Sequence, residues 1–139
     1  AAQHRAVVLA HSGDEFSMPM DFVPFADAYP EVRMILAHLG NGGQASGDPG
    51  HQVRGIQASK HDNIFTDTSS CRSLLPGLIE WAMQQVGTDR ILFGTDTRCI
   101  SPPPSARIDQ VDLPEPEKRM ILSDNPVRLQ ALGPMLKEH

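Results

Sequence analysis

Four short apolar runs recur along this chain of 139 residues, and they constrain its fold more than any other feature. The runs are AVVLA at Ala6–Ala10, RMILA at Arg33–Ala37, NIFTD at Asn63–Asp67 and RILFG at Arg90–Gly94. None shows the polar alternation of a half-exposed strand, so we interpret each run as a strand buried on both faces. Strands of this kind form parallel sheets, in which helices connect one strand to the next.

Segments with the spacing of amphipathic helices separate the four runs. We expect helices within Met20–Pro30, His51–His61 and Ser73–Gly87. The first is expected to begin near Phe22 or Val23, because Pro24 suits only the first turn of a helix. The third is expected to end at Gly87, since glycine is the residue that most often follows a helix.

The last part of the chain, Pro114–Leu136, has the pattern of two short helices. Asp124 or Asn125 is expected to cap the second of them. Gly133 is expected to follow its last turn. The length of the chain gives room for one core, so we expect a single domain over residues 1–139.

Two longer loops, Gly40–Gly50 and Thr97–Asp112, follow the second and the fourth predicted strand. Both exceed the usual length of a connection in an α/β unit, and loops of that length are commonly functional or disordered. Strand, loop and helix therefore follow one another four times. This order predicts an α/β fold of four parallel βα units.

A histidine or an aspartate stands at the end of every predicted strand, and the first two strands share the pattern LAHxG. The four residues are His11, His38, Asp67 and Asp96. In parallel α/β folds the carboxyl ends of the strands form the ligand-binding edge. Imidazole and carboxylate groups at that edge suit acid–base chemistry or a divalent ion such as Zn, Fe or Mn. The alternative is structural, because aspartate also forms turns and caps helices.

Composition excludes several classes of partner. The formal net charge of −5 and the aromatic content of 5% argue against nucleic-acid binding, which needs a basic face or stacking side chains. No apolar stretch has the ~20 residues of a membrane-spanning helix, so no membrane is expected. Cys71 and Cys99 show no disulfide or metal-binding spacing, which fits thiols in a reducing, cytoplasmic compartment.

Five segments in order carry a resemblance to a known family: AHSG, YPEVRMILAHLGNGG, NIFTDTSS, GTDRILFGTDT and ILSDNPVRLQALG. With them the sequence resembles the amidohydrolase superfamily, in the amidohydrolase-related branch that includes aminocarboxymuconate-semialdehyde decarboxylase. The resemblance implies a (β/α)₈ TIM barrel with a divalent metal at the carboxyl ends of its strands. The chain resembles the carboxyl-terminal half of such a barrel, strands five to eight.

The resemblance also implies roles for three residues. It makes His11 the metal ligand of strand five, His38 the catalytic histidine of strand six, and Asp96 the metal ligand or base of strand eight. Zn²⁺ is the first expectation for the metal, with Mn or Fe as alternatives. Asp67, at the end of strand seven, receives no role, because the family is less uniform there.

The chain departs from the family pattern in its first half. It has no HxH pair, and it is about half as long as an eight-stranded barrel of ~250 residues. A half-barrel exposes two unpaired sheet edges, so a homo-oligomer or a partner half-barrel is expected.

Two functions follow from this reading. The first is a metal-dependent hydrolase or decarboxylase acting on a small organic acid or ring substrate. The alternative is a non-catalytic half-barrel, or open α/β module, that acts through association. Metal analysis of the chain would discriminate between them.

Overall fold

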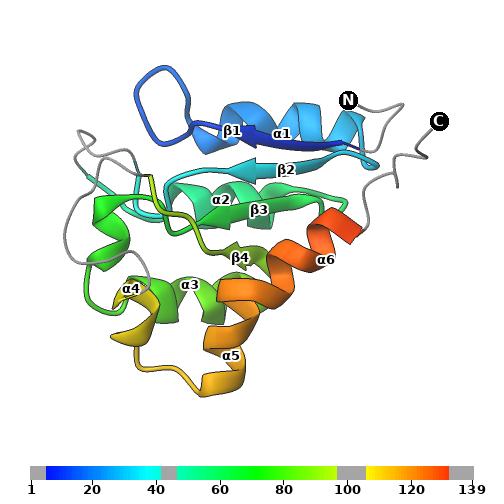
Figure 1. The fold of residues 1–139 in the computed structure, drawn as a ribbon. Helices are drawn as coiled ribbons and strands as arrows, with labels where there is room; N and C mark the ends of the chain where they lie inside the picture. Colours follow the sequence, from blue (N-terminus) through cyan, green and yellow to red (C-terminus); the bar gives the residue numbers. More distant parts are fainter. Residues whose placement is uncertain (1–5, 42–46, 97–105, 132–139) are drawn as a thin grey trace.

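Four strands pair in chain order into one parallel sheet in the computed structural model, which describes residues 6–41, 47–96 and 106–131 (Figure 1). The strands are β1 (Val7–Ala10), β2 (Arg33–Leu36), β3 (Ile64–Asp67) and β4 (Ile91–Leu92). Their register places Ala10 opposite Leu36, Leu36 opposite Thr66, and Thr66 opposite Ile91. The four predicted strands are confirmed, although each is shorter than the apolar run that predicted it. The prediction that each is buried on both faces holds for β3 but is wrong for β1, where Leu9 is 65% exposed because no described helix covers that face of the strand.

Helices connect the strands, as a parallel sheet requires. The connecting helices are α1 (Pro19–Ala28), α2 (His51–Ala58) and, between β3 and β4, the 3₁₀ turn η2 (Cys71–Leu74), α3 (Leu78–Val86) and the 3₁₀ turn η3 (Thr88–Arg90). After β4 follow α4 (Ala106–Asp109), α5 (Glu115–Arg119), the π-helical η4 (Met120–Asp124) and α6 (Asn125–Ala131). Among the described residues no helix is long and apolar enough to cross a membrane.

The two faces of the sheet are covered by different helices. Successive residues of a strand point to opposite faces. Ile64 accordingly packs with side chains of α1 and α2, whereas its neighbour Phe65 packs with Leu129 of α6. In β4, Ile91 packs with α3 and Leu92 with α6. The sheet is therefore flanked by α1, α2 and α3 on one side and by α6 over β3 and β4 on the other (Figure 1).

The start of α1 differs from the prediction. The helix begins at Pro19 rather than near Phe22 or Val23, and Pro24 lies in its interior. Pro19 suits the first position of a helix because its φ is already fixed there. A side-chain oxygen of Asp21 accepts the Met18 N–H at 3.2 Å, which satisfies one of the free donors of the first turn.

The helix predicted within Ser73–Gly87 is divided in two. The 3₁₀ turn η2 ends at Leu74, and α3 begins at Leu78. Gly77 precedes α3 with a φ of 76°, a left-handed conformation that glycine adopts without steric cost. The predicted end at Gly87 is confirmed.

The start of α2 is fixed by the segment that precedes it. Asp48 accepts the Gly50 N–H at 2.8 Å and pairs with Arg54 at 2.7 Å. The hydrogen bond from Gly50 lowers the pKa of the Asp48 carboxyl, and the nearby Arg54 and His51 lower it further, against the opposing effect of burial.

The predicted caps in the last segment are wrong, because α5, η4 and α6 follow one another without interruption. Asn125 does not cap a helix. Its Nδ2 donates to the carbonyl oxygens of Thr88 and Ile91, both at 2.8 Å. Gly133 lies outside the described residues.

The structure also differs from the predictions for the loop Thr97–Asp112 and for the cysteines. The predicted loop Thr97–Asp112 contains the short helix α4 in its described part. Cys71 is disulfide-bonded, so its interpretation as a free thiol is wrong. The expectation of a reducing compartment loses that support.

Candidate active site

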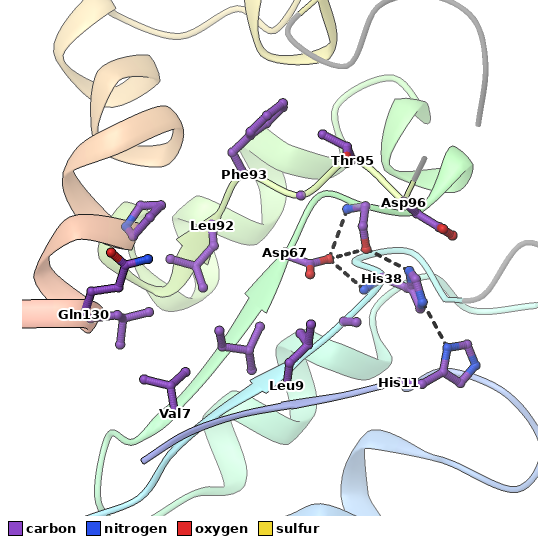
Figure 2. A pocket seen from close by; sticks show the side chains of 16 residues that line it. Val7, Leu9, His11, His38, Asp67, Leu92, Phe93, Thr95, Asp96 and Gln130 are labelled. Atoms are coloured by element: carbon purple, nitrogen blue, oxygen red, sulfur yellow. Dashed lines mark hydrogen bonds between the residues drawn. The ribbon is translucent and has the colours of Figure 1, made fainter. Parts of the chain in front are cut away.

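Side chains from all four strand ends line one cavity of about 690 Å³ (Figure 2). His11 follows β1, His38 follows β2, Asp67 ends β3 and Asp96 lies beyond β4. Parallel strands bring their carboxyl ends to one edge, which is why residues far apart in the sequence meet here. The structure thus brings the three predicted site residues to one cavity, together with Asp67.

The backbone of His38 has an uncommon conformation. Its φ of 75° lies in the left-handed region, which costs a residue other than glycine of order 1–3 kcal/mol. The carboxylate of Asp67 holds it there by accepting the His38 N–H at 3.0 Å, and the Asp67 carbonyl accepts the Leu39 N–H at 2.8 Å. Asp96 also has a positive φ, of 33°. Backbone conformations of this kind gather at functional sites.

A chain of hydrogen bonds joins the ends of β1, β2 and β3 (Figure 2). Ser69 Oγ donates to Asp67 Oδ1 and lies 2.8 Å from His38 Nδ1. The other ring nitrogen of His38, Nε2, lies 2.9 Å from Nδ1 of His11. The two imidazole rings meet edge to face, with centroids 4.8 Å apart.

Asp14 lies at the far end of this chain of bonds. One of its carboxylate oxygens is hydrogen-bonded to Nε2 of His11, so both ring nitrogens of His11 have a partner. Our sequence interpretation missed Asp14 and Ser69 as parts of the site. Both leave a weak local signal: Asp14 is three residues after His11, and Asp67 and Ser69 have the spacing of an Asx turn.

The wall of the cavity is apolar. It is formed by Val7, Leu9, Ile35, Leu92, Phe93 and Leu129. A volume of this size, with a mainly apolar wall and few polar groups at one edge, is typical of sites for small molecules.

The described residues match a divalent metal in the type of their donors. Two imidazoles and two carboxylates line the cavity, and nitrogen and oxygen donors of this kind suit Zn, Mn or Fe. Within residues 6–41, 47–96 and 106–131, however, no three His, Cys, Asp or Glu side chains are grouped closely enough to hold an ion. The described ranges therefore offer donors of the right type without a complete set of ligands.

A family model described as "Amidohydrolase" matches residues 1–130 of the chain, so the chain belongs to that family. No match was found among curated proteins. The fold matches part of the TIM barrel of that family, which confirms the predicted fold class.

Solved structures share this fold at low identity. An amidohydrolase 2 from Bifidobacterium longum subsp. infantis is 16% identical, with a TM-score of 0.61 over 86% of this chain and 47% of that chain. A 5-carboxyvanillate decarboxylase from Sphingomonas paucimobilis is also 16% identical, with a TM-score of 0.57 over 79% and 37%. A dihydroxybenzoic acid decarboxylase from Polaromonas sp., solved with manganese and 2-nitroresorcinol, is 19% identical, with a TM-score of 0.55 over 79% and 37%. The chain spans less than half the length of each.

Proposed function

We propose that this chain carries one side of the active site of a metal-dependent hydrolase or decarboxylase acting on a small organic acid or ring compound. The observation that supports the proposal is the meeting of His11, His38 and Asp96 at one apolar cavity, at the carboxyl ends of parallel strands. Membership in the amidohydrolase family adds support, and so do the names of the structural neighbours, two of which are decarboxylases of aromatic acids.

His11 and Asp96 are the residues that would hold the ion. A bound divalent ion would supply Lewis-acid chemistry, by polarising a substrate oxygen or lowering the pKa of a water. We keep Zn²⁺ as the first candidate, and the manganese in the Polaromonas structure adds weight to Mn²⁺. Both ring nitrogens of His11 are hydrogen-bonded, so ligation requires that one of these two bonds be exchanged for the metal.

His38 would act as the general acid or base, transferring a proton to or from the substrate or a water. Its ring lies at the cavity edge, next to His11, and Nδ1 is held by Ser69. General acid–base catalysis needs a group within hydrogen-bond reach of the reacting atom, and histidine is the side chain most often used for it. The apolar wall would bind the carbon skeleton of the substrate.

Metal titration of the metal-free chain tests this proposal. We expect Mn²⁺ or Zn²⁺ to bind in isothermal titration calorimetry, and Asp96→Asn or His11→Ala to weaken that binding by at least about tenfold, because each removes a ligand. Asp62→Asn is the matched control, since Asp62 also has a positive φ, of 55°, and its side chain is exposed and absent from the cavity lining. A chain that binds neither metal, or an Asp96→Asn variant that binds as the unaltered chain does, would contradict the proposal.

A second candidate is a non-catalytic half-barrel that acts through association. The observation that favours it is the apolar surface left uncovered on β1, where Leu9 is 65% exposed and Val7 is 38% exposed. We propose a second copy of the chain as the partner at this surface. Tight, stoichiometric metal binding would favour the enzyme, whereas association without metal binding would favour this candidate.

A further inference from the structure

The hydroxyl of Ser69 lies between a carboxylate and an imidazole, and it has only one proton to donate. On one side is Asp67 Oδ1, which also accepts the backbone N–H groups of His38 and Ser69, each at 3.0 Å. A carboxylate oxygen with three donors around it acts only as an acceptor. The Ser69 hydroxyl therefore donates its proton to Asp67.

The direction of the next hydrogen bond follows from this. Ser69 Oγ lies 2.8 Å from His38 Nδ1, and its own proton is already engaged by Asp67. Oγ can then only accept, so the proton of this bond belongs to His38 Nδ1. In a neutral imidazole with a proton on one nitrogen, the other nitrogen carries the lone pair. That nitrogen is Nε2, which lies at the cavity edge and accepts from Nδ1 of His11 at 2.9 Å. A neutral His11 then has no proton for its contact with Asp14, so that contact is given up unless His11 carries both ring protons. The side chains of His11 and Asp14 are exposed, whereas Asp67 and Ser69 are buried, so the buried end of the chain of bonds decides the tautomer of His38.

The packing around Asp67 and Ser69 leaves them little freedom to turn away. Asp67 is 7% exposed and Ser69 is 5% exposed. Gly94, beyond β4, lies against both: a Cβ at this position would be 2.9 Å from Asp67 Cγ and 3.0 Å from Ser69 Cβ. The backbone of Gly94 thus closes the space behind the pair, and its lack of a side chain is what admits them.

We propose that Asp67 and Ser69 are positioning residues that set the tautomer of His38, with the proton on Nδ1 and the lone pair of Nε2 directed to the cavity edge. Partners of this kind, which bond the remote nitrogen of a histidine, fix the ring and its tautomer. The inference rests on the proposed function only for the use made of Nε2, as a proton acceptor. The tautomer itself is a property of the chain.

Nitrogen NMR of the ¹⁵N-labelled chain tests the tautomer directly, without metal or substrate. At alkaline pH, where imidazoles are neutral, two-bond ¹H–¹⁵N correlations distinguish a protonated ring nitrogen from a bare one. We expect a protonated Nδ1 and a bare Nε2 in His38 of the unaltered chain. Ser69→Ala should shift His38 towards the Nε2–H form, and Ser69→Thr, which restores a hydroxyl, should return the original pattern.

Ser73→Ala is the matched control for these variants. Ser73 is a buried serine from the same segment, and its hydroxyl donates to the Leu39 carbonyl at 2.6 Å without touching a ring. It should leave the His38 signals unchanged. An Nε2–H tautomer in the unaltered chain would overturn the proposal even if Ser69→Ala failed to fold, and so would a Ser69→Ala spectrum like that of Ser73→Ala. Failure of the metal titration above would leave this result standing, so the two proposals can fail separately.

Discussion

At the scale of single residues, the site depends on close packing behind its polar groups, where Gly94 leaves no room for a larger side chain. Gly94→Ala would place a methyl group 2.9 Å from Asp67 Cγ, closer than real side chains come, and 3.0 Å from Ser69 Cβ, which is tighter than nearly all real contacts. Either residue must then move, which breaks the contact between Ser69 and His38. We expect an altered His38 spectrum and a loss of about 1–3 kcal/mol of unfolding free energy, as overpacking usually costs.

Gly55→Ala is the control for this prediction. Gly55 is also crowded, since a Cβ there would be 3.1 Å from Pro19 Cβ, but it lies in α2 and packs against Leu36. The variant can lose stability in chemical denaturation, yet it should leave the His38 signals unchanged. If Gly94→Ala also left them unchanged, the packing role given to Gly94 would be wrong.

The residues that meet at the cavity were largely predictable, but the bonds among them were not. His11, His38 and Asp96 follow apolar runs, and parallel strands bring such positions to one edge. Nothing in the sequence indicates that His38 adopts a φ of 75°, because most residues avoid that conformation and tertiary hydrogen bonds impose it here. The contact between Ser69 and His38 depends on that backbone geometry, so it could not be predicted from the sequence.

At the scale of elements, Asn125 connects the last helical segment to the sheet. Its side chain is buried and donates to the carbonyl oxygens of Thr88 and Ile91. Asn125→Ala would leave two carbonyl groups without these partners, and unsatisfied buried groups cost about 1–3 kcal/mol each. We expect a loss of at least about 2 kcal/mol of unfolding free energy in urea denaturation.

Asn125→Asp gives the sharper comparison. It has nearly the same shape but brings a carboxylate, an acceptor, against two carbonyl acceptors. It should destabilise the chain at neutral pH at least as much as the alanine variant. Arg128→Ala, which removes an exposed contact to the Asp89 carbonyl from the same helix, should cost well under 1 kcal/mol. Equal losses in Asn125→Ala and Arg128→Ala would contradict the role given to Asn125.

The strands were predicted better than the helices for a physical reason. A strand buried on both faces has a continuous apolar run, which marks its position directly, as in β3. Helix ends depend on local hydrogen bonds that compete closely in energy. Pro24 was expected to stand in a first turn, but Pro19 occupies the first position of α1 instead. The π-helical η4 has no pattern that separates it from an ordinary helix.

At the scale of the whole molecule, one face of the sheet is covered unevenly. Leu129 of α6 packs on Phe65 and Leu92, in β3 and β4, whereas Leu9 of β1 lies open on the cavity side of the sheet. Parallel sheets are normally covered on both faces. β1 is also one of the two outer strands of the sheet, and no described strand pairs with its outer edge. The chain spans 37% to 47% of the length of its structural neighbours, in keeping with a sheet that needs further cover.

The apolar surface of β1 therefore predicts that the isolated chain self-associates. We expect analytical ultracentrifugation to show species heavier than the 15.2 kDa monomer, with a fraction that rises with concentration. Leu9→Lys should weaken this association by about tenfold or more, because burial of a leucine is worth about 1.5–3 kcal/mol and a buried lysine adds a further cost. Val127→Lys is the matched control, since Val127 is 63% exposed but lies on α6 outside the cavity lining. A monomer at every concentration, or equal effects of the two lysine variants, would show that a second copy is not what covers β1.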